Sequence, residues 1–209
     1  MVAALTTERL RLRPWREEDL APFAALNADP EVMRYFPGLL GREESDAMAA
    51  RLSAGIERDG WGLWALERRD SGDFIGFTGL AVPRFDFPFL PAVEVGWRLA
   101  RSAWGSGYAT EAARCALDHG FGPLGLEEVV SLTSVHNERS RAVMRRLGMV
   151  RDPRDDFEHP AYEPGDPLRA HVLYRLRRHH RAESDCHASD RDADRRPRTA
   201  GGAGRAAVT

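Results

Sequence analysis

The stretch WGSGYA, residues 104–109, limits the fold of this chain more than any other segment. The residues before it, VEVGWRLA (93–100), are typical of a strand, and those after it, TEAARCALDHGF (110–121), are typical of a helix. Gly105 and Gly107 permit conformations and a close approach that side chains would block. The pattern predicts bare backbone N–H groups at a helix N-terminus, a place that binds phosphate. A tight turn that only caps the helix is the alternative.

Two common phosphate-binding motifs are excluded. The chain contains no lysine, so it lacks the lysine on which a P-loop NTPase depends. It also lacks the three-glycine fingerprint of dinucleotide-binding folds. A phosphate bound at WGSGYA therefore belongs to a ligand other than the nucleotides that these two motifs bind.

Strand-like and helix-like segments follow one another over residues 1–176. Strands are expected around 10–12 and at 61–69, 73–82, 93–100, 127–135, 149–151 and 170–176, and helices at 17–29, 43–57, 110–121 and 137–149. Mixed hairpins and crossover helices predict an α+β domain with a mixed, mostly antiparallel sheet flanked by helices. Residues 177–209 lack aromatic side chains, and we expect them to form a disordered, polar, arginine-rich tail.

Composition narrows the function classes. A length of 209 residues suits one domain, and a net charge of −2 with 43% hydrophobic residues suits a soluble globular protein. No basic face is evident, so we expect no nucleic-acid partner, and no histidine or cysteine spacing predicts a metal site. The N-terminus lacks a secretion signal and no apolar run could span a bilayer, so we expect a cytoplasmic monomer or homodimer without membrane contact.

The chain resembles the GNAT superfamily of N-acetyltransferases, and within it the RimJ/RimL-like branch. The superfamily signature [Gln/Arg]-x-x-Gly-x-[Gly/Ala] matches residues 104–109 except at Trp104, and WGxGYATEA is a familiar RimJ/RimL-like form. The block VHNERSRAVMRRLGM resembles a later motif, and TTERLRLRPWREEDL resembles the first strand and helix of the branch. The resemblance covers roughly residues 6–176 and implies the acyl-CoA N-acyltransferase fold.

The same resemblance implies acetyl-CoA as co-substrate and a set of binding residues. Asn137 and Ser140 are expected to flank the pantetheine arm, and Trp97 and Leu99 to lend it backbone groups. The diphosphate is expected to lie against the segment that carries the glycines, which is made of Trp104, Gly105, Ser106, Gly107, Tyr108, Ala109 and Thr110.

Acetyl transfer needs a base for the amine and a proton for the departing thiolate. Glu94 is the candidate base, since similar enzymes use a glutamate of this strand and partial burial would raise its pKa. The alternative is an exposed glutamate paired with an arginine, and His136 is a second candidate base. Ser140 is the candidate acid. It would also be the third residue of a helix that Asn137 caps, and both roles are compatible.

Two segments are candidates for the acceptor side. In residues 155–167, Asp155, Asp156 and Glu158 would attract a cationic amine, or they are ordinary solvated acids. Residues 84–94 are rich in Phe and Pro and would form a wall or lid, a part of the core, or a partner interface. Cys115 is expected to be a buried helix residue and not an acylation nucleophile.

The function that the resemblance implies is transfer of acetyl from acetyl-CoA to a primary amine by direct attack in a ternary complex. The amine belongs to a protein N-terminus or to a small molecule. Two alternatives remain open at this point. One is a non-catalytic GNAT-fold module that binds CoA or acyl-CoA for regulation, and the other is a transferase that uses a longer acyl-CoA such as succinyl-CoA.

Overall fold

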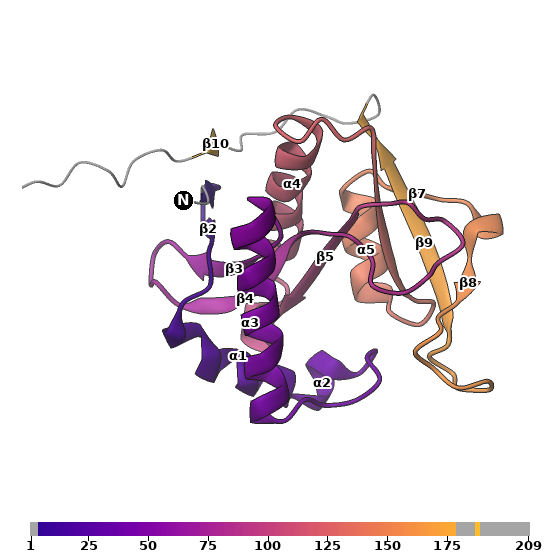
Figure 1. Cartoon of the computed structure of the whole chain (residues 1–209), viewed down its shortest axis with the longest axis horizontal. Coiled ribbons are helices and arrows are strands. Elements are labelled where there is room, and N and C mark those ends of the chain that lie inside the picture. Colours follow the sequence, from indigo (N-terminus) through magenta and orange to yellow (C-terminus); the bar gives the residue numbers. More distant parts are fainter. Residues whose placement is uncertain (1–3, 179–186, 189–209) are drawn as a thin grey trace, which may run out of the picture.

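A computed structural model describes residues 4–178 and 187–188 of the chain (Figure 1). One mixed sheet has the strand order β10-β1-β2-β3-β4-β5-β6-β9-β7, and β8 also pairs with β9. The strands are β1 (Leu5–Thr6), β2 (Leu10–Arg13), β3 (Leu63–Arg68), β4 (Phe74–Ala81), β5 (Glu94–Leu99), β6 (Glu128–Ser134), β7 (Val150–Arg151), β8 (Phe157–Glu158), β9 (Ala170–Arg177) and β10 (His187–Ala188). The helices are α1 (Leu20–Asn27), α2 (Pro30–Met33), α3 (Arg42–Asp59), α4 (Tyr108–Phe121) and α5 (Glu138–Arg146), with short 3₁₀ turns η1 (Glu17–Asp19), η2 (Arg101–Ala103) and η3 (Pro153–Asp155).

The predicted α+β architecture is confirmed. The strand pairs between described residues are antiparallel, except that β5 and β6 run parallel. Helix α2 and strands β1, β8 and β10 were not predicted, because their segments are too short to show a periodicity. Most of the predicted tail, residues 177–209, lies outside the described residues. Within it, residues 187–188 form β10, which pairs with β1. The domain boundary between residues 176 and 177 stays a prediction.

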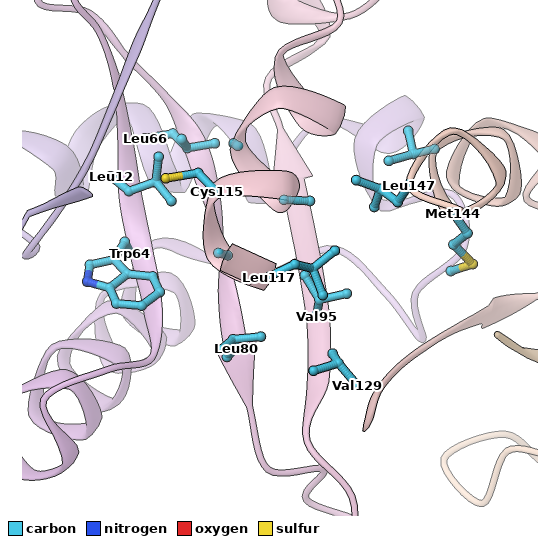
Figure 2. Packing of buried hydrophobic residues seen from close by; sticks show 14 of the residues in the cluster. Leu12, Trp64, Leu66, Leu80, Val95, Cys115, Leu117, Val129, Met144 and Leu147 are labelled. Atoms are coloured by element: carbon cyan, nitrogen blue, oxygen red, sulfur yellow. The ribbon is translucent and has the colours of Figure 1, made fainter. Parts of the chain in front are cut away.

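Two hydrophobic clusters cover opposite faces of the sheet. Alternate residues of β4 and β5, including Leu80 and Val95, pack with Leu117 of α4 in the larger cluster (Figure 2). Phe77 of β4 points the other way and packs with Phe23 of α1 and Ala49 of α3. The sheet is therefore held between α4 on one face and the α1–α3 group on the other. Of the helices described, none is long and apolar enough to cross a membrane.

The parallel pair β5–β6 is unusually short. Only Glu94 and Val130 are paired in the ladder, although β6 pairs with β9 along its whole length. Past this point the Ser131 hydroxyl donates to the Val95 carbonyl at 2.9 Å, which replaces a ladder bond with a side-chain bond. Strands β5 and β6 therefore diverge, and the sheet opens between them.

A buried ion network joins the start of the chain to β3. Arg13 donates to both carboxylate oxygens of Asp19, at 2.7 and 2.8 Å, and to Glu67 at 2.6 Å. Arg13 is 4% exposed and Asp19 is 1% exposed. Burial by itself would lower the pKa of the Arg13 guanidinium, but its bonds to the two carboxylates raise it above the ordinary value. The network fixes the turn between β2 and α1.

We predict that Asp19→Ala lowers the free energy of unfolding by about 3 kcal/mol or more, because it leaves the buried Arg13 charge with one partner fewer. Urea denaturation followed by circular dichroism measures the change. Asp59→Ala is the matched control, since Asp59 pairs with Arg58 at the surface and its removal should change stability little. Equal effects of the two substitutions would contradict the role of the buried network.

Candidate active site

One continuous cavity of about 2230 Å³ runs along the opening between β5 and β6. Its lining includes residues 104–110, Glu94 of β5, and Phe36, His159 and Tyr162. A pocket for one drug-sized ligand has a volume of roughly 300–1,000 Å³. This cavity therefore has room for an extended ligand and a second molecule.

The glycine segment presents free backbone amides to this cavity. Gly105 and Gly107 have φ values of 77° and 83°, which L side chains rarely adopt. Gly107 is the N-cap of α4 and no side chain caps the helix there. Within the described part of the chain, the backbone N–H groups of residues 105–110 donate no hydrogen bond. Six consecutive amides at the positive end of a helix dipole form a suitable cradle for a diphosphate.

Arg9 adds a cation to this cradle, and sequence reasoning missed it. Its Nη1 donates to the Ser106 carbonyl at 3.0 Å, and its guanidinium lies 4.7 Å from the centre of the Tyr108 ring. Glu111 holds Arg9 in place with a bond of 2.7 Å from Nε, and also accepts a bond of 2.5 Å from Thr7. Arg9 is almost one hundred positions before the glycines, so no local pattern could have linked them.

Trp104 positions the glycine loop and limits which backbone groups of Leu99 can bind a ligand. Its Nε1 donates to the Leu99 carbonyl at 2.9 Å, and the Arg139 guanidinium lies 4.4 Å from the centre of its ring. The Leu99 carbonyl is therefore already engaged inside the protein. Only the N–H of Leu99 remains as the backbone group that it could lend to a ligand.

Trp97 keeps its backbone groups available at the opening. The carbonyls of Val93 and Val95 accept bonds from β6, so residues two apart on β5 direct their backbone groups toward that strand. Trp97 belongs to the same set, but β6 has already diverged at this level. Its N–H and C=O thus lie at an unpaired strand edge inside the cavity.

Asn137 and Ser140 meet at the head of α5, as the sequence predicted. The Asn137 Oδ1 accepts from the Ser140 backbone N–H at 3.2 Å, which is the expected cap. The Asn137 side-chain amide donates to Ser140 Oγ at 3.1 Å and to Thr133 Oγ1 at 3.0 Å. Because the Ser140 oxygen accepts a bond, its own proton is available to a ligand in the cavity that it lines.

Glu94 lines the cavity without a partner. No described residue forms a hydrogen bond or ion pair with its carboxylate, so the alternative of a glutamate paired with arginine is wrong. Burial raises the pKa of Glu94 to about 7. The ladder with β4 has no bulge, so the Glu94 side chain projects from one face of the sheet. The backbone groups of Trp97 lie in the plane of the sheet, and both can reach the opening.

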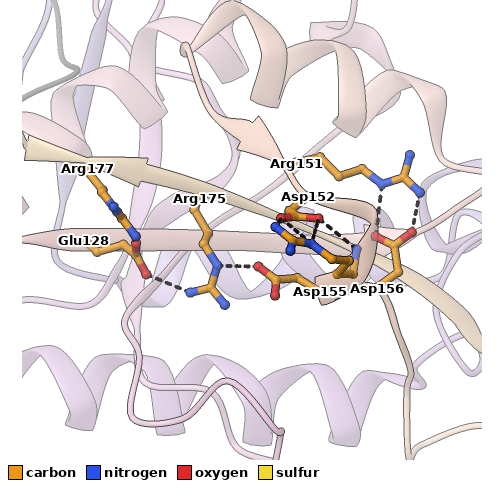
Figure 3. Close-up of polar contacts among 8 residues, drawn as sticks. Glu128, Arg151, Asp152, Asp155, Asp156, Arg175 and Arg177 are labelled. Carbon is orange, nitrogen blue, oxygen red and sulfur yellow. Dashed lines mark hydrogen bonds and ion pairs between the residues drawn. The ribbon is translucent and has the colours of Figure 1, made fainter.

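The predicted acidic acceptor loop is neutralised within the protein. Asp155 binds Arg175 and Asp156 binds Arg151 (Figure 3). Glu158 binds Arg169, so these acids are not free to attract an amine. These ion pairs instead join the loop to Arg175 of β9, to Arg151 of β7 and to Arg169, which precedes β9.

Phe85 of the Phe-rich segment lines the cavity together with His159 and His171. We call this part the acceptor end, because the sequence predicts the acceptor side there. The ring centroids of Phe85 and Phe87 lie 4.9 and 5.2 Å from that of His159, which in turn lies 4.7 Å from His171. Burial and the charge of His171 lower the pKa of His159 to about 4, so His159 is neutral at pH 7. The segment forms a wall. His136, in contrast, is exposed and does not line the cavity, which removes the second candidate base.

Cys115 is 1% exposed and packs in the larger hydrophobic cluster, as predicted for a buried helix residue. The remaining sequence candidates, Ser106, Ala109 and Thr110, all line the cavity.

Comparison with known proteins agrees with this geometry. Residues 9–150 match the model of the acetyltransferase (GNAT) domain. This chain belongs to the GNAT family. The match and the relatives named as N-acetyltransferases identify an acyltransferase enzyme, which confirms the predicted fold and enzyme class.

Three similar proteins illustrate the family. The uncharacterized protein YkkB of Bacillus subtilis is 33% identical over 146 residues, which cover 69% of this chain and 84% of YkkB. The FsC-acetyl coenzyme A-N(2)-transacetylase of Aspergillus fumigatus is 34% identical over 153 residues, or 70% of this chain and 64% of that protein. The crystal structure of an acetyltransferase from Agrobacterium tumefaciens superposes with a TM-score of 0.67 at 29% identity, covering 84% of this chain and 95% of that one.

We predict that Gly107→Glu weakens the binding of CoA by about 100-fold or more, because a carboxylate would enter the cradle and engage Arg9. A Cβ at this position would lie 3.5 Å from Arg9 Nη2. Calorimetric titration measures the affinity. Gly72→Glu is the control for backbone strain, since Gly72 has φ of 76° and open space around it, in the turn between β3 and β4. Undiminished affinity of Gly107→Glu would overturn the cradle.

We predict that Ser140→Ala slows acetyl transfer about 10- to 100-fold without unfolding the protein. The alanine variant keeps the backbone N–H that Asn137 caps, so it tests the hydroxyl alone. Steady-state kinetics and a thermal melt are the two measurements. Ser53→Ala, on α3 and outside the cavity, should change neither. An unchanged rate for Ser140→Ala would leave Ser140 with the capping role only.

Proposed function

We propose that this enzyme transfers the acetyl group of acetyl-CoA to a primary amine by direct attack in a ternary complex. One observation carries the proposal. The row of unpaired amides at residues 105–110 and the unpaired carboxylate of Glu94 share a single cavity. The amides suit the diphosphate end of the donor, and the carboxylate suits the amine.

The donor lies along the opened strand edge in this proposal. The diphosphate binds the amides of residues 105–110 with Arg9 beside it, and the backbone groups of Trp97 and the N–H of Leu99 bind the pantetheine arm. Asn137 and Ser140 flank the arm from the other side of the opening. Acetyl-CoA supplies an activated thioester, and the protein supplies position and proton transfer.

Two side chains manage the protons. Glu94 accepts the proton that the amine loses when its nitrogen bonds to the acetyl carbon. The carbon–sulfur bond then breaks, and the Ser140 hydroxyl donates a hydrogen bond to the departing sulfur. The proton removed from the amine balances the one that the CoA thiol finally carries.

The acceptor belongs to one of two groups in this proposal. The RimJ/RimL-like features of the sequence favour a protein N-terminus. The relative named FsC-acetyl coenzyme A-N(2)-transacetylase favours an amine on a small molecule. Phe85 lines the cavity beside His159, and Phe87 packs against both rings. An aromatic wall of this kind suits a small acceptor or the first residues of a chain.

Calorimetric titration with acetyl-CoA is the direct test, with desulfo-CoA and succinyl-CoA as comparators. Micromolar binding of acetyl-CoA, followed by thiol release with a library of amines, is the expected result. Binding without thiol release from any amine would favour the non-catalytic module. Preference for succinyl-CoA would favour a longer acyl donor. Binding of none of the three would overturn the proposal.

We predict that kcat/KM rises with pH through an apparent pKa of about 7, because only the ionised form of Glu94 accepts a proton. Glu94→Gln should lower turnover about 100-fold or more and remove this limb of the profile, while the affinity for CoA stays the same. A profile that keeps the limb in the variant would make Glu94 a structural residue.

The same shift gives a control for folding. Burial raises the pKa of Glu94 from 4.5 to about 7, so the native state favours the protonated carboxyl. The native protein therefore loses stability relative to Glu94→Gln as the pH rises from 4.5 to about 7. The melting temperature of Glu94→Gln relative to that of the unsubstituted protein should therefore be higher at pH 8 than at pH 5. Thermal melts at these two pH values measure the difference.

A further inference from the structure

Arg98 is a buried cation at the acceptor end of the cavity. It lies on the same face of β5 as Glu94, four positions along the strand. Its guanidinium lies 4.0 Å from the centre of the Phe36 ring, and Phe36 lines the cavity beside Arg98 itself. The neighbouring Tyr35 carbonyl accepts a bond of 3.0 Å from Tyr162, which joins this region to the acceptor wall.

The Arg98 guanidinium is only partly satisfied. Its Nη1 donates to Asn27 Oδ1 at 2.6 Å, and this is the one hydrogen bond that it makes to a described residue. Its Nε is buried with no acceptor. No carboxylate of the described residues lies within ion-pair distance, and the side chain is only 9% exposed. Asn27 is neutral and is itself held by a bond to Ser45.

Arg13 is a second buried arginine, and its guanidinium has carboxylate partners inside the protein. Arg13 is 4% exposed and binds two carboxylates, whose bonds raise its pKa despite burial. Arg98 is about as deeply buried, and burial without a counter-ion lowers its pKa to about 10. A buried charge with no counter-ion is costly, and a buried guanidinium that lines a cavity is suited to receive an anion from outside.

We propose that Arg98 binds a carboxylate that a substrate brings into the cavity. The guanidinium geometry suits a carboxylate, and Glu94 on the same strand faces the amine. This inference rests on the proposed acyl transfer to an amine and specifies its substrate class. The carboxylate belongs either to the acceptor, as in an amino acid, or to the acyl chain, as in succinyl-CoA.

The first experiment uses the native chain and matched substrate pairs. L-amino acids and ω-amino acids of increasing length are each compared with their amides, using acetyl-CoA as donor. Succinyl-CoA is compared with butyryl-CoA, which has the same carbon chain without the carboxylate. We expect kcat/KM to be about 10- to 100-fold higher for the acid member of one of the two series. The amide has the less basic amine, which is unprotonated to a larger extent at neutral pH. Amine basicity therefore favours the amide, and it cannot be the cause of a preference for the acid.

Two substitutions separate recognition from packing. Asn27→Asp places a carboxylate where the amide now binds Arg98, and it is nearly isosteric, so the fold should survive. It should abolish the preference for acids by giving Arg98 an internal partner. Arg98→Gln should abolish the preference mainly through KM, whereas Arg98→Lys should restore part of it. Arg42→Gln, at an exposed arginine outside the cavity, is the control and should keep it.

The outcomes are distinct. Equal rates for acids and amides and for the two longer donors would overturn the role of Arg98 while leaving acetyl transfer intact. A preference that persists in Asn27→Asp and Arg98→Gln would also overturn it, because the acid would then bind elsewhere. Absence of transfer from every donor to every amine would instead contradict the proposed function itself.

Discussion

The divergence of β5 from β6 is the constraint on which the rest of this site depends. A parallel pair normally continues its ladder, but here Glu94 and Val130 are the only paired residues. The hydroxyl of Ser131 takes the next carbonyl, and beyond it the edge of β5 faces a cavity. Because both strands are otherwise anchored, β5 by β4 and β6 by β9, the opening is built into the sheet.

The charged groups near this opening are of two kinds, those paired within the protein and those that lack a charged partner. The acids of the 155–158 loop are paired with arginines, which makes the loop a support for β9 and not a source of free negative charge (Figure 3). Three groups that line the cavity lack hydrogen-bond partners among the described residues: the backbone amides of residues 105–110, the Glu94 carboxylate and Nε of Arg98. Unsatisfied polar groups are costly in a folded protein, and their place in this cavity makes them suited to bind ligands.

Local chemistry explains why the glycine loop and the cap of α5 could be predicted from the sequence. Gly105 and Gly107 have to lie between a strand and a helix for their conformations to be useful, and both patterns are visible in consecutive residues. Asn137 three residues before Ser140 is a capping arrangement that needs no distant partner. Helix α3 and the β3–β4 hairpin were likewise predicted within a few residues, because their periodicity is long enough to read.

The sequence by itself determined the longer strands and helices along the chain, the glycine loop before α4 and the cap of α5, since each depends on neighbours a few residues apart. Only the tertiary structure decided what surrounds Glu94, Arg9 and Arg98. Arg9 meets Ser106 because β2 packs beside α4, and Arg98 meets Asn27 because α1 crosses the sheet. No described residue forms a hydrogen bond or ion pair with the Glu94 carboxylate, so its raised pKa comes from burial. Charge pairing over long sequence separations leaves no periodic signal, and the fold alone determines which charges meet.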